Sequence, residues 1–383
     1  MSKIVLCPDS FKGSLSAKEV VEIMAEKIKR LCPASRLVCI PLADGGEGTI
    51  DVLSDTIQCE KAKVNVHDSL GNIISAEYLI YDSGKKCLIE SASAVGLDLI
   101  EKSKRQPMKM SSRGVGELIL DAAFKGCEEI FVSLGGTGTC DGGMGLLNEL
   151  GFKFYDHQGI RLVGKGEDLT KIGIIDAKDV NPCLKKIKLK AVCDVSAPLY
   201  GKKGAAFVFA PQKGASPDEI EILDAGLKNF AVVSQEAGLT DFYTAMKPGS
   251  GAAGGMGFAM TGLLNAEYIS GVDFVMEAVD FENRIKDADL IVTGEGRIDK
   301  QSLMGKVGDG VLKRAERHRI PVVGLGGKVE NADLLEQAGF SAVYEISDPN
   351  KSLEENMNKE TTLLNIENAL EKCVSMFGLN SCG

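Results

Sequence analysis

IFVSLGGTGTCDGGMGLL, at residues 130–147, is the stretch around which the rest of the chain is organised. It opens with an apolar run rich in β-branched residues, typical of a buried strand, and a helix is predicted to restart near Met144. Glycines in the intervening loop permit positive φ and let backbone N–H groups approach an anion. We therefore expect a phosphate cradle, the alternative being a tight turn without a ligand. The cradle would comprise Gly135, Gly136, Thr137, Gly138 and Thr139.

Composition limits the class of protein. A chain of 383 residues predicts two domains. A net charge of -10 without any basic run argues against nucleic acid or an anionic membrane as the main partner. Three histidines make a histidine-ligated metal or a histidine-based triad improbable. Eleven cysteines without a CxxC pair, and no signal-peptide pattern at the start, indicate a reducing cytoplasm. No apolar run is long enough to span a bilayer.

Both ends of the chain read as alternating strands and helices. Parallel strands are predicted at 3–7, 36–42, 289–292, 321–325 and 342–346. Residues 293–299 and 326–328 are predicted as loops, and 348–360 as a solvated polar connection. From about residue 63 the pattern changes to the alternation of antiparallel hairpins. We therefore expect one α/β domain formed by both chain ends, with a second domain inserted between about residues 65 and 285.

Acidic residues recur in glycine-containing loops, mostly at predicted strand ends, where parallel sheets bind ligands. Phosphoryl transfer requires phosphate donors, a carboxylate-held Mg²⁺, cations, and a carboxylate that orients the acceptor hydroxyl. All four are present, although no GxxxxGK[ST] motif and no protein-kinase signature occurs. The acidic residues are Asp9, Asp44, Glu47, Asp141, Asp194, Glu295 and Asp299, and the cations are Lys12, Arg113, Arg297, Lys306 and Lys328.

Six segments, in unbroken order over residues 3 to about 330, resemble the bacterial glycerate kinase family that lacks a Walker motif. They are CPDSFKGSLSA, PLADGGEGT, SLGGTGTCDGGMGLL, CDVSAPLYGKKGAAFVFAPQKGAS, PGSGAAGGMGFA and TGEGRIDKQSLMGK. The resemblance implies ATP-dependent phosphorylation of D-glycerate, most often to 2-phosphoglycerate. It also implies a flavodoxin-like, parallel-sheet domain made of residues 1–64 and 286–383, and an inserted α/β domain with a mixed sheet at 65–285.

Candidate roles follow from the chemistry of each side chain. Asp194 is the candidate for orienting or deprotonating the glycerate hydroxyl, and the alternative is a capping aspartate. Ser10, Lys12 and Arg113 are candidates for binding glycerate, with a solvated arginine as the alternative for Arg113. The candidates for Mg²⁺ are Asp44 and Glu295, which are otherwise loop or cap residues.

A second glycine-rich loop, with Gly249, Ser250 and Gly251, is also predicted to cradle phosphate, and Arg297 and Lys328 to bind the phosphates of ATP. With Gly254 this loop spells GxGxxG, which leaves a nicotinamide-dependent oxidoreductase of a hydroxy acid as an alternative, although no strand is predicted before it. A non-catalytic sensor of a small acid is a further alternative. The expected partners are D-glycerate and, in a homodimer, a second copy of the chain.

Overall fold

The computed structural model describes residues 2–11, 13–46, 49–303 and 305–378. The chain divides into two compact units, Met1–Ile57 with Gly271–Gly383, and Gln58–Ser270. The observed boundaries lie before those expected at 64 and 285. Strand β3 (Cys59–His67) already pairs with β4 (Ile73–Tyr81), and α9 (Gly271–Ala278) and α10 (Phe281–Ile285) follow the second boundary. Gly271 packs so closely in the first unit that a Cβ there would lie 2.0 Å from the carbonyl oxygen of Asp44.

The first unit is built on a five-stranded sheet that is parallel throughout. Its order is β14 (Ala342–Glu345), β13 (Val322–Val329), β12 (Leu290–Ile298), β1 (Lys3–Leu6) and β2 (Arg36–Cys39). Numbered along the chain within this unit, the order is 2-1-3-4-5, which confirms the flavodoxin-like class. The helices of this unit are α1 (Ala17–Leu31), α2 (Thr49–Thr56), α9, α10, α11 (Val307–His318), α12 (Ala332–Gln337), α13 (Leu353–Met357) and α14 (Lys359–Met376).

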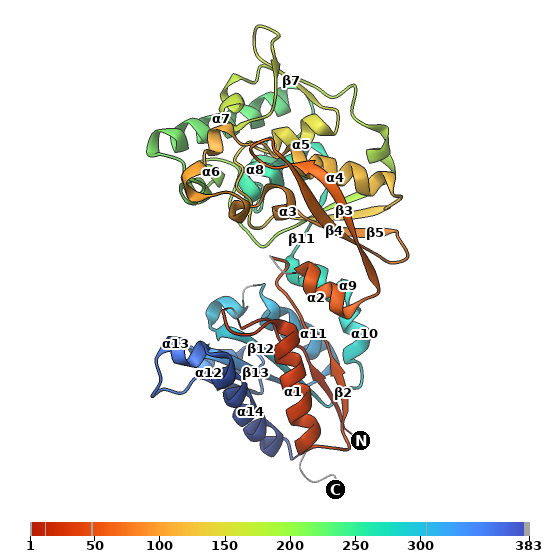
Figure 1. Cartoon of the computed structure of the whole chain (residues 1–383), viewed down its shortest axis with the longest axis vertical. Coiled ribbons are helices and arrows are strands. Elements are labelled where there is room, and N and C mark those ends of the chain that lie inside the picture. The colour runs from red at the N-terminus through yellow and green to blue at the C-terminus, as the bar shows by residue number, and fades with distance from the viewer. Residues whose placement is uncertain (1, 12, 47–48, 304, 379–383) are drawn as a thin grey trace. The chain divides into compact units, whose positions relative to one another are not determined.

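Helices α1 and α14 cover one face of this sheet, as Figure 1 shows in red and dark blue. Helix α1 begins with a complete capping box of Ser16 and Glu19. Its apolar face, including Met24 and Ile28, joins a core with Ile366 and Leu370 of α14 and the inner side chains of the sheet. This packing holds the far end of the chain against the beginning.

Strands β12 and β13 are longer than the sequence pattern predicted. Residues 293–299 and 326–328 were expected as loops, but the two strands pair as far as Ile298 and Val329. Glycine permits this close pairing, because a Cβ on Gly327 would lie 2.4 Å from the carbonyl oxygen of Gly296. As a result Arg297 and Lys328 are register partners at the strand ends.

The second unit contains a six-stranded mixed sheet, in agreement with the predicted hairpins. Strands β11 (Glu267–Ile269), β10 (Lys188–Val192), β6 (Glu129–Ser133) and β5 (Lys86–Glu90) run parallel, and β4 and β3 continue as an antiparallel meander. A small antiparallel sheet is formed by β8 (Arg161–Leu162), β7 (Lys153–Tyr155) and β9 (Ile174–Asp176). The helices are α3 (Ala92–Val95), α4 (Arg113–Phe124), α5 (Met144–Glu149), α6 (Ala205–Phe209), α7 (Pro217–Glu236) and α8 (Ala252–Phe258).

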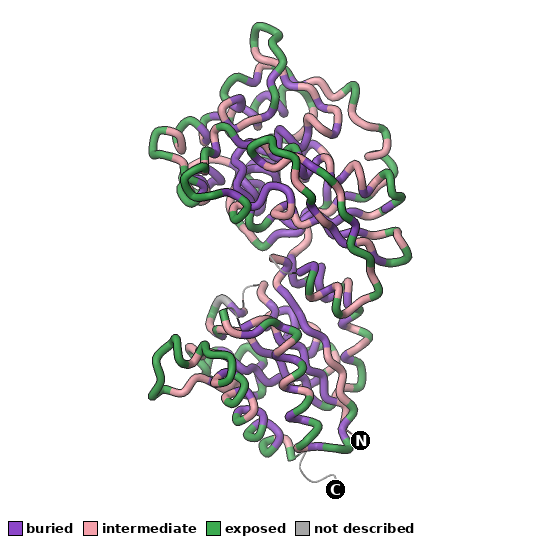
Figure 2. The backbone as a smooth tube through the Cα atoms, viewed as in Figure 1, coloured by how far each residue is buried: buried purple, intermediate pink, exposed green. Residues whose placement is uncertain are grey.

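Each unit has its own buried core, drawn purple in Figure 2. Helix α8 is followed by a π-helical turn over Ala259–Leu263. The predicted polar connection at 348–360 was wrong in part, because it contains helix α13 with a capping box of Ser352 and Glu355. Within the described residues, no helix has both the length and the apolar character needed to cross a membrane.

Candidate functional site

The loops after β1 and β2 line an acidic pocket of about 280 Å³ in the first unit. The Ser10 amide donates to the Asp9 carboxylate at 2.6 Å, and the Asp9 amide donates to the carbonyl of Gly294 in β12 at 2.8 Å. Asp44 lies in the same pocket, and its carboxylate accepts a hydrogen bond from the Gly46 amide at 3.1 Å. The pocket thus brings together Ser10 and Asp44, while the predicted Lys12 lies outside the described residues.

Glu295 lies within β12, and its side chain is only 13% exposed. Burial raises its pKa to about 7, and the carboxylates of Asp9 and Asp299 add to the rise. A hydrogen bond with Ser302 and the charge of Lys306, 4.0 Å away, act in the opposite direction. The charge of Asp9 therefore acts on Glu295, and Asp9 lines the same pocket as Asp44. The sequence had given Asp9 no specific role.

The raised pKa predicts a pH-dependent stability. Folded chains retain a proton on Glu295 between its ordinary pKa of 4.5 and about 7, where unfolded chains release it. The free energy of unfolding should therefore fall as the pH rises through this window, by about 1–3 kcal/mol. Urea midpoints at pH 5 and pH 8 should show a smaller difference in Glu295→Gln than in the unmodified chain. Glu354→Gln, at an exposed position, is the control. An equal difference between the pH 5 and pH 8 midpoints in all three proteins would contradict the assignment.

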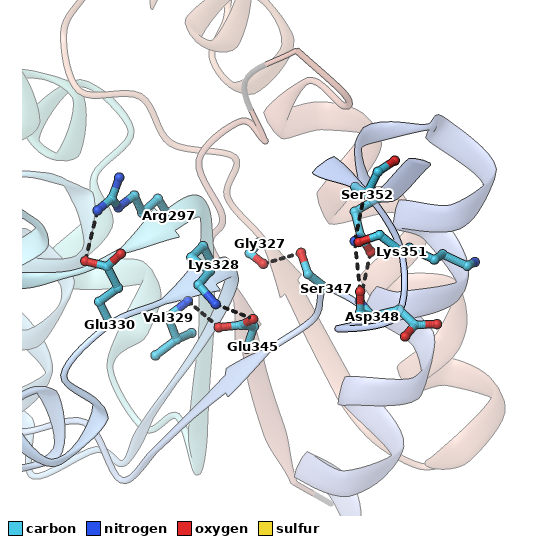
Figure 3. Close-up of polar contacts among 11 residues, drawn as sticks. Arg297, Gly327, Lys328, Val329, Glu330, Glu345, Ser347, Asp348, Lys351 and Ser352 are labelled. Carbon is cyan, nitrogen blue, oxygen red and sulfur yellow. Dashed lines mark hydrogen bonds and ion pairs between the residues drawn. The ribbon is translucent and has the colours of Figure 1, made fainter. Parts of the chain in front are cut away.

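A larger pocket of about 610 Å³ lies at the carboxyl ends of β12, β13 and β14. Arg297 and Lys328 line it and carry acidic partners, as Figure 3 shows. The Arg297 guanidinium lies 2.9 Å from Glu330, and the Lys328 ammonium lies 3.0 Å from Glu345. Glu345 also accepts from the Val329 amide at 2.9 Å. Both cations are more than half exposed, so a stronger anion can replace a carboxylate without breaking the fold.

The segment after β14 forms one wall of this pocket. The Ser347 hydroxyl donates to the carbonyl of Gly327, which fastens the segment to β13 (Figure 3). Asn356 accepts from the Asp348 amide at 2.8 Å, and its own amide group donates to carbonyls of Asp348 and Lys351. The wall is therefore preformed by internal hydrogen bonds, although the sequence pattern had indicated only a polar connection.

The parallel strands of the second unit end in one row. Glu90, Ser133 and Val192 are register partners across β5, β6 and β10. Asp194, two residues beyond β10, is exposed at this edge. Because ligands bind at the carboxyl ends of parallel strands, Asp194 is well placed for chemistry. Glu90 is a carboxylate that the sequence reasoning missed at the same edge, because its position becomes evident only from the strand register.

The loop at Gly249, Ser250 and Gly251 packs against the loop that carries Asp194. Gly251 donates to the carbonyl of Ala197 at 3.0 Å, and the buried Ser250 hydroxyl donates to the carbonyl of Thr244. A Cβ on Gly249 would lie 2.2 Å from the ring of Tyr268, whose hydroxyl donates to the carbonyl of Val195 at 3.1 Å. These glycines allow the two loops to pack closely, and the phosphate cradle at 249–251 stays a prediction.

The same loop bears on the oxidoreductase alternative. The GxGxxG letters follow a short 3-10 turn, Thr244–Met246, where a dinucleotide-binding fold requires a strand. Ala253, Gly254 and Gly255 all have positive φ, so an uninterrupted helix does not follow the motif either. The motif therefore lacks the strand–turn–helix context on which the alternative depended.

The loop at 135–139 differs, because its first glycines are exposed and its base holds a buried cation. Gly135 and Gly136 are exposed, whereas Thr137, Gly138 and Thr139 are buried. Lys213, only 2% exposed, donates to the carbonyl of Thr139 at 2.7 Å and approaches the Thr137 hydroxyl at 3.4 Å. Burial lowers the pKa of this lysine, with the Cys140 thiol and Asp141 acting against it. Lys213 was not found from the sequence, because FAPQKGAS contains nothing that predicts a buried ammonium.

Asp141 has a structural role at the end of this loop. It is fully buried, and its carboxylate accepts from the amide and hydroxyl of Ser112, both at 2.7 Å. The amides of Gly143 and Gly145 also donate to it, at 3.2 and 3.1 Å. These bonds join the beginnings of α4 and α5 and satisfy donors that a helix start leaves unpaired. Asp141 therefore anchors the starts of the two helices.

Arg113 begins α4 but is turned toward acidic side chains. Its Nε lies 3.1 Å from Glu117 and 3.0 Å from Glu149, and the side chain is about half exposed. Glu117 in turn accepts from the amide of His67 at 2.6 Å. The ion pair with Glu149 connects α4 with α5, and the hydrogen bond from His67 connects α4 with β3. Arg113 is thus paired at the helix start, and its role in binding glycerate stays a prediction.

The carboxylates of the first unit suit Mg²⁺ that arrives with a nucleotide. The described residues hold no group of three or more side chains arranged to bind a metal. Magnesium bound with a nucleotide usually takes one or two protein carboxylates, and phosphate oxygens and water complete its shell. Asp44 in the acidic pocket and the partly buried Glu295 fit this requirement.

Comparison with known proteins agrees with this architecture. Glycerate kinase of Halalkalibacterium halodurans is 38% identical over 366 residues, covering 95% of this chain and 96% of that protein. Glycerate 2-kinase of Escherichia coli is 40% identical over 345 residues, covering 90% of each. A Salmonella typhimurium crystal structure described as a glycerate kinase 2 superposes with a TM-score of 0.84 at 36% identity, over 98% of this chain and 99% of that chain. Since the family model also matches residues 4–377, the chain belongs to the glycerate kinase family.

Proposed function

We propose that this protein transfers the γ-phosphoryl group of ATP to the 2-hydroxyl of D-glycerate, giving 2-phosphoglycerate and ADP. The observation that carries the proposal is the 40% identity, over 90% of both chains, to a relative named glycerate 2-kinase. The flavodoxin-like sheet, with cations and carboxylates at its ligand-binding edge, is compatible with a phosphotransferase.

Residues of the second unit are proposed to act on the glycerate hydroxyl and on the transferred phosphoryl group. Asp194 accepts the proton of the glycerate hydroxyl as that oxygen attacks phosphorus, and the bond from phosphorus to the bridging oxygen of ADP breaks. The exposed Gly135 and Gly136 cradle the transferred phosphoryl group. Lys213 beneath the loop supplies a fixed positive charge in a dry environment, where it acts on developing charge more strongly than in water.

Residues of the first unit are proposed to bind ATP, Mg²⁺ and glycerate. Arg297 and Lys328 bind phosphate oxygens of ATP, and Asp44 and Glu295 hold Mg²⁺, which neutralises phosphate charge when it is bound. Ser10 lines the acidic pocket and is proposed to hydrogen-bond glycerate. For Glu295 to bind a metal it must lose its proton, so its affinity for Mg²⁺ should rise as the pH passes 7.

The test is ADP release from Mg-ATP with and without D-glycerate, with the phosphate position read by ³¹P NMR. We expect glycerate-dependent ADP and a single product phosphorylated at position 2. A product phosphorylated at position 3 would support the kinase activity but contradict the proposed transfer to the 2-hydroxyl. Folded protein that shows no stimulation by glycerate would reject the proposed substrate, and NADH fluorescence on mixing would then test the oxidoreductase alternative directly.

A further inference from the structure

The 610 Å³ pocket of the first unit contains an apolar wall that no step of the proposed reaction uses. Phe11 and Ile346 form its buried part, with exposures of 3% and 7%. Leu353 and Met357 of α13 also line it, yet they are 75% and 37% exposed. Large apolar side chains that line a pocket and still face water favour a ligand with an apolar surface of its own.

The position of this pocket matches the ligand site of open parallel sheets. Such sheets bind ligands beyond the carboxyl ends of strands, where the chain order reverses. In the order β2-β1-β12-β13-β14 the reversal lies between β1 and β12. The pocket takes Phe11 and Ser14 from the loop after β1, and Gly296 and Arg297 from the end of β12. It therefore lies at the reversal and extends over the ends of β13 and β14.

The apolar wall is preformed rather than loose. Met357 packs against the loop after β1, since a Cβ on Gly13 would lie 2.5 Å from its terminal methyl group. The Ser14 hydroxyl bonds with that of Thr362 at 2.7 Å, which fixes α14 to the same loop. A volume of about 610 Å³ lies within the roughly 300–1,000 Å³ of pockets that hold small ligands.

Resting on the proposed function, we propose that this pocket binds the nucleoside of the phosphate donor. The base lies on the wall of Leu353, Met357 and Ile346, and Arg297 and Lys328 receive the phosphates at the adjoining strand ends. The ligand class is thus a nucleoside di- or triphosphate with its base held by apolar contact. Segment 347–357, which the sequence left without a function, becomes the part that binds the nucleoside.

A single tryptophan gives a direct binding assay, because the chain contains none. Leu353→Trp places the indole on the proposed wall, and Leu364→Trp places one at a position that is 53% exposed and does not line the pocket. We expect Mg-ADP and adenosine to change the emission of Leu353→Trp and to leave Leu364→Trp unchanged. Leu353→Asp should raise the KM for ATP about tenfold and that for glycerate less than about twofold, while Leu364→Asp changes neither.

Three results would overturn the assignment while leaving the kinase intact. In the first, the emission of Leu353→Trp does not change with Mg-ADP or adenosine. In the second, that emission changes with tripolyphosphate but not with adenosine. In the third, the KM for ATP is unchanged in Leu353→Asp. Failure of the proposed function looks different, since the unmodified protein would then release no ADP in response to glycerate. A nucleotide response of Leu353→Trp in that case would still support the pocket.

Discussion

Replacing Asp194 by asparagine is expected to lower kcat for glycerate phosphorylation by about 10²–10⁴, the usual contribution of a positioned general base. Asparagine keeps the size and hydrogen-bonding capacity of the side chain but cannot accept the proton of the hydroxyl. The residue is exposed at the end of β10, so the free energy of unfolding should change little. Initial rates at saturating substrate, together with urea unfolding, measure both quantities.

The pH profile distinguishes a base from a residue that only shapes the loop. If Asp194 accepts the proton, its replacement should remove the acidic limb of the kcat profile. Asp98→Asn, at another exposed position of the same unit, is the matched control and should keep both rate and profile. A variant of Asp194 with unchanged kcat, or one that loses activity only because it unfolds, would remove Asp194 from this role.

Replacing Lys213 by methionine is expected to lower kcat/KM by about 10²–10³, the loss seen when one preorganised donor to a developing charge is removed. Methionine retains most of the apolar stem and deletes the charge beneath the phosphate loop. The substitution also leaves the buried carbonyl of Thr139 without its donor, so the melting temperature should fall somewhat whichever role the lysine has.

The response to phosphate, and not the melting temperature, separates the two roles of this lysine. If Lys213 only fastens Thr137 and Thr139, Lys213→Met assayed well below its melting temperature should keep most of its kcat/KM and its inhibition by inorganic phosphate. If its charge acts on the phosphoryl group, the folded variant should lose activity and be inhibited less by inorganic phosphate. Lys203→Met, at an exposed position of the same unit, is the control.

Local patterns were sufficient for the architecture. The apolar runs and helical periods at both chain ends, and the alternation after residue 63, predicted a parallel sheet and a mixed sheet, because each pattern reports which faces are buried. The strand-end rule directed attention to Asp44, which lines the acidic pocket, and to Glu295, which lies within β12 instead of after it; their role in holding Mg²⁺ stays a prediction. Glycines were harder to interpret, because this residue type occurs both in an exposed loop, at Gly135, and where two loops pack closely, at Gly251.

The sequence by itself determined the family, the two sheets and most of the acidic and basic residues worth testing, since these depend on residue type and spacing along the chain. Only the tertiary structure decided which of them share a pocket. Asp141 bonds with Ser112 and Arg113 pairs with Glu149, and Lys213 lies under a loop more than seventy residues earlier in the chain. Such pairings join distant segments, and no local pattern records the distance between two side chains that meet only after the chain has folded.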